Sequence, residues 1–90
     1  MKPRYTPPDA NQNGIVAALR QIPGVTVIDL REVGKGVPDL IVGRDSKNYL
    51  IELKTPKGKL RLIQALHTQT WKGQTAVCRS MDDVLQVIGL

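Results

Sequence analysis

The 90-residue sequence has one cysteine, three aromatic residues and no phenylalanine, and it lacks any long hydrophobic run. Cys78 has no partner for a disulfide within the chain, and its apolar neighbours predict a buried strand position instead. Apolar stretches such as residues 15–19 are too short to span a bilayer, and residues 1–4 (MKPR) do not lead into a secretory signal. We therefore expect an intracellular, cytoplasmic protein with no membrane association.

Charge is the strongest compositional feature. The net charge is +5 and the sequence pI is near 9.7, a balance that attracts polyanions. Charge alone leaves two interpretations equally open, nucleic-acid binding and a solvated basic surface. So short a chain is expected to form one domain with a small core, and for this reason we also expect it to form a dimer.

The pattern of apolar residues and turn formers predicts helices alternating with strands. Residues 1–8, with three prolines and two cations, predict an extended basic arm, and residues 9–90 predict one domain. The first helix is expected to begin with Asp9 as its N-cap, and Leu62, Ile63 and Leu66 are expected on the apolar face of the second. Strands are predicted at residues 25–30, 38–43, 49–54 and 75–79, and helices at 9–22, 60–71 and from 81 onward. The order α-β-β-β-α-β-α predicts an α/β domain, a four-stranded mixed sheet flanked by helices, with the last two strands parallel.

The polar run at residues 44–48 predicts a hairpin turn centred between Asp45 and Ser46. Antiparallel pairing around that centre places Asp39 directly opposite Glu52 on one face of the sheet. Lys54, two residues beyond Glu52, falls on the same face. A slip of one residue would separate these groups, so the prediction depends on the position of the turn.

Two facing carboxylates repel each other unless a cation or a proton lies between them. A pair of carboxylates with a backbone carbonyl and waters is typical of Mg²⁺ sites, and the nearby Lys54 could orient a water or stabilise charge on a phosphate. The alternative is structural: Glu52 and Lys54 form an exposed ion pair of little consequence, and Asp39 is a turn-adjacent acid. Cations suited to a phosphodiester backbone are also present, at Lys35, Lys57, Lys59 and Arg61.

Residues 36–42 (GVPDLIV) and 50–54 (LIELK) together resemble the PD-(D/E)XK nuclease signature. The particular residues of these two segments resemble the virus-type replication-repair nuclease (VRR-NUC) domain, in its stand-alone and often phage-borne form. The resemblance extends over nearly the whole chain and includes residues 9–16, Leu60, Gln64, His67, 71–73 and 79–83. It implies a restriction-endonuclease-like core and, for a phage-encoded protein, a location in the host cytoplasm.

The resemblance implies a role for several residues. Asp39 and Glu52 would ligate Mg²⁺ or Mn²⁺ together with the backbone carbonyl of Leu53, Lys54 would be the catalytic lysine, and Gln64 would point toward the active site. The family's first helix often carries a supporting glutamate. The corresponding positions in this sequence are Gln12, Asn13 and Gly14, so we expect at most one well-held metal.

The function implied by the resemblance is metal-dependent endonucleolytic cleavage of DNA. The resemblance to stand-alone members implies a homodimer that acts on branched DNA such as four-way (Holliday) junctions. No organic cofactor is expected. Gln12 and His67 are possible accessory residues, although a lone helical histidine is more often a surface or packing residue. The alternative function is a catalytically inactive DNA-binding module on a nuclease fold, which the absent first-helix glutamate favours.

Overall fold

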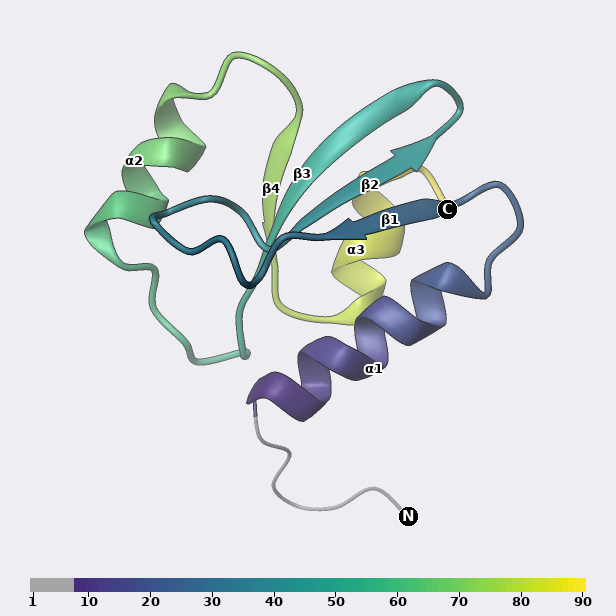
Figure 1. Cartoon of the computed structure of the whole chain (residues 1–90), viewed down its shortest axis with the longest axis horizontal. Helices are drawn as coiled ribbons and strands as arrows, with labels where there is room; N and C mark the ends of the chain where they lie inside the picture. The colour runs from purple at the N-terminus through teal and green to yellow at the C-terminus, as the bar shows by residue number, and fades with distance from the viewer. Residues whose placement is uncertain (1–7) are drawn as a thin grey trace.

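The computed structural model describes residues 8–90 of the chain, with side chains from Gln12 onward. Most of the predicted basic arm, residues 1–7, lies outside this part. Three helices and four strands follow one another in the predicted order (Figure 1). They are α1 (Pro8–Arg20), β1 (Thr26–Asp29), β2 (Leu40–Arg44), β3 (Lys47–Leu53), α2 (Leu62–Thr70), β4 (Thr75–Cys78) and α3 (Met81–Val87).

The four strands form one mixed sheet in the order β1-β2-β3-β4. β1 and β3 each pair antiparallel with β2, whereas β3 and β4 are parallel. β2 and β3 pair with Gly43 opposite Asn48 and Leu40 opposite Ile51. The predicted register is therefore confirmed, and its next step beyond the ladder sets Asp39 opposite Glu52.

The hairpin and the loop before β2 both depend on left-handed backbone. Asp45 and Ser46 have φ of 52° and 63°, which is the geometry of a two-residue turn between antiparallel strands. Gly34, Lys35 and Gly36 likewise all have positive φ. Gly36 is also tightly packed, because a Cβ added there would lie 2.6 Å from Cγ1 of Ile63. This loop therefore packs against the first turn of α2.

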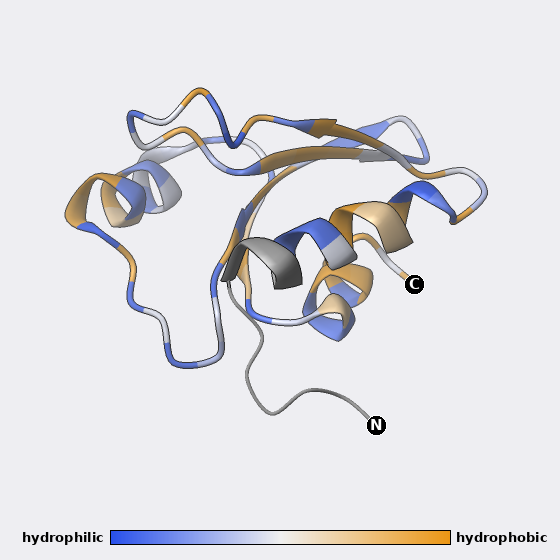
Figure 2. Cartoon of the chain, turned by 60° about the horizontal axis from the view of Figure 1, so that its bottom comes forward, coloured by the Kyte–Doolittle hydropathy of each residue, from blue (hydrophilic) through white to orange (hydrophobic). Residues whose placement is uncertain are grey.

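The apolar core lies on one face of the sheet. Side chains of β2 and β3 that share a face by the register, such as Leu40, Val42 and Ile51, are fully buried. α1 adds Leu19 and α3 adds Val84 to the same buried cluster. Both views show α2 set apart from α1 and α3, at the end of the sheet (Figures 1 and 2). Cys78 is fully buried in β4, as predicted.

Two local predictions are wrong. α1 begins at Pro8, so Asp9 lies inside the helix and not at its cap; a proline is well suited to a first helical turn, where its missing N–H has no partner to lose. In α2, the predicted apolar face is exposed: Leu62 is 76% and Leu66 49% accessible, and the buried residue is Gln64. Helical periodicity identifies a face but does not determine what covers it.

In the described part of the chain, no helix is both long enough and apolar enough to cross a membrane.

Candidate functional site

Asp39 and Glu52 lie side by side where β2 begins and β3 ends. The backbone of Asp39 continues the β1–β2 pairing, because its carbonyl accepts a hydrogen bond of 2.7 Å from the Leu30 N–H. Its side chain turns to β3, where Oδ2 accepts from the Leu53 N–H at 2.8 Å. This hydrogen bond fixes the Asp39 carboxylate next to Glu52, so the two acids form one site.

Glu52 is an unusually placed acid, since only 4% of it is exposed. Burial first, and then the nearby charge of Asp39, raise the pKa of Glu52 to about 7, although the positive charges of Lys54 and Arg61 act in the opposite direction. Among the described residues, neither Glu52 nor Asp39 forms an ion pair. The interpretation of Glu52 and Lys54 as an exposed ion pair is therefore wrong.

Gln64 connects α2 to this acidic pair. Its Nε2 donates a hydrogen bond of 3.0 Å to Oε2 of Glu52, and its Oε1 accepts from the Arg61 N–H at 2.9 Å. Because the backbone N–H can only donate, it fixes which end of the Gln64 amide faces Glu52. The first turn of α2 thus orients a donor toward the buried carboxylate, which explains why the buried residue of this helix is polar.

The helix α1 reaches the site through Gln12. Its Nε2 donates a hydrogen bond of 3.3 Å to the carbonyl of Leu53, the residue between Glu52 and Lys54. The next residue, Lys54, is partly buried, and its N–H donates to the Cys78 carbonyl at 3.0 Å. Adjacent strands and α1 therefore hold the backbone of residues 53 and 54 from both sides.

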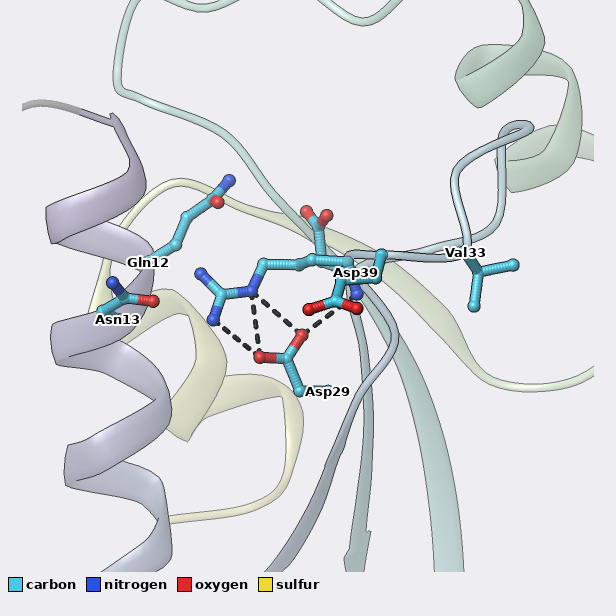
Figure 3. A pocket seen from close by; sticks show the side chains of 7 residues that line it. Gln12, Asn13, Asp29, Val33 and Asp39 are labelled. Atoms are coloured by element: carbon cyan, nitrogen blue, oxygen red, sulfur yellow. Dashed lines mark hydrogen bonds and ion pairs between the residues drawn. The ribbon is translucent and has the colours of Figure 1, made fainter.

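A polar cavity of about 660 Å³ opens beside Asp39, between α1 and the loop that precedes β2 (Figure 3). On its wall, Arg31 forms an ion pair of 2.6 Å with Asp29. Hydrogen bonds from the side chain and the backbone of Arg31 lower the pKa of Asp29 to about 2. Asp29 is thus an ionised acid already engaged by a guanidinium. The cavity is lined by Gln12, Asn13, Asp29, Arg31, Glu32, Val33 and Asp39.

The remaining predicted residues are an arginine whose charge acts on Glu52, three exposed lysines and His67. Arg61 is close enough for its charge to act on Glu52, whereas Lys35, Lys57 and Lys59 are exposed on loops. His67 stacks on Trp71 with ring centroids 5.2 Å apart. Its Nδ1 is buried without a hydrogen-bond partner in the described part, so His67 packs on α2 and contacts neither acid through a hydrogen bond.

The donor set suits a hard divalent cation. Asp39 and Glu52 contribute carboxylate oxygens, and the Leu53 carbonyl lies between Glu52 and Lys54 in the chain. Oxygen ligands of this kind are those that Mg²⁺ and Mn²⁺ prefer. Within the described residues, no group of three or more acidic, histidine or cysteine side chains is placed to hold a metal. Asp39, Glu52 and the Leu53 carbonyl offer the oxygen donors that one such cation could bind.

The sequence model of the VRR-NUC domain matches residues 8–82 of the chain, which include every element from α1 to the start of α3. The chain belongs to the VRR-NUC family. This is a family of nucleases, in general structure-specific ones that act on DNA. No curated protein and no solved structure matches the chain. Family membership and the mixed sheet with flanking helices together confirm the predicted nuclease-like fold.

Sequence reasoning missed the Asp29–Arg31 pair. Both residues were available as an acid at the end of a predicted strand and a cation two positions later. Nothing in that spacing indicates, however, that the loop would fold Arg31 back onto Asp29 beside Asp39. The sequence also gave no sign that Arg79 contacts the loop after β3, as its hydrogen bonds to Thr55 and Gly58 demonstrate.

Gln12 offers a direct test of the one-metal prediction for this VRR-NUC chain. Gln12→Glu places a third carboxylate beside the Leu53 carbonyl, where the glutamine now donates a hydrogen bond. We expect Mn²⁺ to bind about tenfold more tightly, since ligand charge raises cation affinity. We also expect the metal-free protein to melt at a lower temperature, because two acceptors then face each other. Calorimetric titration and thermal unfolding measure the two effects.

The matched control is Asn13→Asp, which adds the same charge to the exposed neighbouring position on the same cavity. This variant is expected to change Mn²⁺ affinity by less than about threefold, the size of a screened surface effect. Equal gains from both substitutions would show that only general electrostatics is involved, and that Gln12 does not lie at the cation site.

Proposed function

We propose that this VRR-NUC protein is a divalent-metal-dependent endodeoxyribonuclease whose catalytic site is formed by Asp39, Glu52, Lys54 and Gln64. The observation that carries the proposal is the opposed pair of acids, in which Glu52 is buried against Asp39 and has its pKa raised to about 7. Keeping an uncompensated carboxylate pair costs stability. The two carboxylates lie together at the ends of two adjacent strands, an arrangement that suits the binding of a cation.

In the proposed reaction, Asp39, Glu52 and the Leu53 carbonyl would hold Mg²⁺ or Mn²⁺, which would supply positive charge that stabilises the phosphoryl transition state. Lys54 donates a hydrogen bond that orients the attacking water and stabilises the developing negative charge. The water oxygen bonds to phosphorus as the bond to the leaving deoxyribose oxygen breaks. One proton of the water passes to solvent, and the leaving oxygen takes one up. Gln64 keeps Glu52 in position throughout.

The proposed substrate is branched DNA, such as a four-way junction, and the proposed active form is a homodimer. A chain of 90 residues offers little surface for reading bases, so recognition is expected to depend on backbone and shape. A two-fold dimer would present two equivalent sites to a symmetric junction. Lys35, Lys57, Lys59 and Arg61 are proposed to contact the phosphates.

An inactive DNA-binding module is the second candidate. It is favoured by Gln12, which reaches the Leu53 carbonyl from the first helix with an amide in place of an acid. A binding module would keep its affinity for DNA when Asp39 and Glu52 are replaced by alanine, and it would never cleave. The two candidates therefore differ in a product that can be measured.

The test is a cleavage assay on an end-labelled four-way junction and a linear duplex of matched sequence. Each is incubated with the protein in Mg²⁺, Mn²⁺ or EDTA. We expect metal-dependent nicking of the junction at least about tenfold faster than of the duplex, because shape rather than sequence selects the substrate. Equal cutting of both substrates would contradict branch selectivity, and binding without any cleavage would favour the binding module.

A further inference from the structure

The end of β4 holds the segment that follows the proposed catalytic strand. Nη1 of Arg79 donates a hydrogen bond of 2.9 Å to the Thr55 carbonyl and a second bond to the Gly58 carbonyl. One residue earlier, the Cys78 carbonyl accepts from the Lys54 N–H at 3.0 Å. β4 therefore contacts both the backbone of Lys54 and the turn that comes directly after it.

The turn at residues 55–58 depends on this contact. It is closed by a hydrogen bond of 3.0 Å from the Gly58 N–H to the Thr55 carbonyl. Among the described residues, the two bonds from Arg79 are the hydrogen bonds that join residues 55–60 to the rest of the chain. A Cβ at Gly58 would lie 2.8 Å from Oγ1 of Thr55, so the turn is closely packed on itself but has few attachments elsewhere.

Arg79 is itself well anchored. Its N–H donates a hydrogen bond of 2.8 Å to Oδ2 of Asp83, whose own N–H donates to Oγ of Ser80 at 3.1 Å. These are the capping contacts of α3. Within the described residues no carboxylate forms an ion pair with the Arg79 guanidinium. The helix cap thus fixes the backbone of Arg79, from which the guanidinium reaches the turn.

The segment that Arg79 holds is part of a long stretch without acids. Residues 53–81 contain no aspartate or glutamate, and their cations are Lys54, Lys57, Lys59, Arg61, Lys72 and Arg79. Lys57 and Lys59 are exposed on or beside the turn. A rigid loop bearing several cations next to a nuclease site matches the spaced negative charges of a phosphodiester backbone.

We infer that Arg79 is a positioning residue that orders the turn at residues 55–58, so that Lys57 in the turn and Lys59 beside it form a DNA-backbone contact surface next to Asp39 and Glu52. The inference rests on the proposed function for the identity of the partner. Its structural part, the ordering of the turn by Arg79, is independent of cleavage. Arg79 acts on DNA mainly through the turn, and its substitution removes more than one phosphate contact.

Limited trypsin digestion tests the ordering of the turn. In Arg79→Met, cleavage after Lys57 and Lys59 is expected to be about fivefold or more faster, because local opening exposes those bonds. Cleavage after Lys72, in the loop before β4, is the internal reference and is expected to stay the same. Arg44→Met is the matched control, since Arg44 likewise donates to a backbone carbonyl, that of Ile88, at 2.8 Å.

The salt dependence of DNA binding in EDTA tests the contact surface. Each phosphate contact contributes about 0.9 to the slope of log K against log salt concentration on duplex DNA. Lys72→Met, which removes one exposed cation from the same acid-free stretch, is expected to lower the slope by about 0.9 or less. Arg79→Met is expected to lower it by about 2, because the turn lysines lose their positions as well.

The outcomes separate this inference from the proposed function. Unchanged cleavage after Lys57 and Lys59, or faster cleavage at all sites in both Arg79→Met and Arg44→Met, overturns the ordering role. A slope change no larger than that of Lys72→Met overturns the contact surface. Wild-type protein that binds DNA without cleaving it contradicts the nuclease but leaves both tests valid.

If Arg79→Met does not fold, Arg79→Lys replaces it. This variant is expected to give intermediate protection of the turn from trypsin and a salt-dependence slope near that of wild type.

Discussion

Replacing Glu52 by glutamine is expected to raise the melting temperature of the metal-free protein at pH 8 and to abolish cleavage of DNA. Glu52 is buried beside Asp39, and its pKa is raised from 4.5 to about 7. The folded state therefore binds the Glu52 proton more tightly than the unfolded state does. At pH 8 the carboxylate is ionised in both states, and the folded state carries the cost of burying it.

The size and sign of the effect follow from linkage. Raising the Glu52 pKa from 4.5 to about 7 adds stability on the order of a few kcal/mol, which is fully present below pH 4.5 and is lost as the pH rises through 7. Glutamine has nearly the same shape as glutamate, carries no charge and can still accept the hydrogen bond from Gln64. We expect a gain of about 1–3 kcal/mol, or about 5–15 °C in Tm, at pH 8. At pH 5 the gain is expected to be small.

Thermal unfolding of wild type and Glu52→Gln at pH 5 and pH 8, with and without Mn²⁺, measures this prediction. Mn²⁺ is expected to stabilise wild type at pH 8 and to have little effect on the variant, because the variant lacks one of the two proposed carboxylate ligands. Asp45→Asn is the control, since it removes one charge from the exposed hairpin turn. A lower Tm for Glu52→Gln at pH 8 would show that the ionised Glu52 stabilises the fold.

The sheet could be predicted from the sequence because its determinants are local. A polar turn flanked by apolar alternation fixed the β2–β3 register, and residues Asp45 and Ser46 adopt the left-handed backbone that such a turn requires. Since side chains alternate with a period of two, that register also predicted which acids would face each other. To predict that Asp39 faces Glu52, it was therefore enough to place this one turn correctly.

Contacts between distant segments could not be predicted in the same way. The apolar spacing of α2 predicted a buried stripe, whereas the helix meets the sheet through Gln64 and leaves Leu62 and Leu66 exposed. Periodicity reports the amphipathic character of a helix but carries no information about the depth at which it docks. The predicted parallel pairing of β3 and β4 likewise does not specify that the Arg79 side chain reaches the turn after β3.

Lys54→Met is expected to reduce the rate of DNA cleavage by about 100- to 1000-fold, the range for loss of a charged group that stabilises a transition state. Lys54 follows the buried acid by two residues, and its charge acts on Glu52. Methionine retains the length of the side chain, so packing around the aliphatic stem is largely preserved. DNA binding in EDTA is expected to change by less than about threefold, as for the loss of one cation among several.

Lys57→Met is the matched control, because it removes the same charge three residues further on, from an exposed turn. It is expected to weaken binding and to leave the single-turnover rate at saturating protein within about threefold of wild type, since binding is then complete. This comparison separates a group that acts on the reacting phosphate from one that only attracts the DNA.

The most direct test of the proposed site is therefore the single-turnover cleavage rate of a four-way junction with wild type, Lys54→Met and Lys57→Met in Mg²⁺. A site formed by Asp39, Glu52 and Lys54 predicts cleavage by wild type and Lys57→Met and a loss of about 100-fold or more for Lys54→Met. Cleavage by Lys54→Met at a rate near that of wild type, with DNA binding intact, would contradict it.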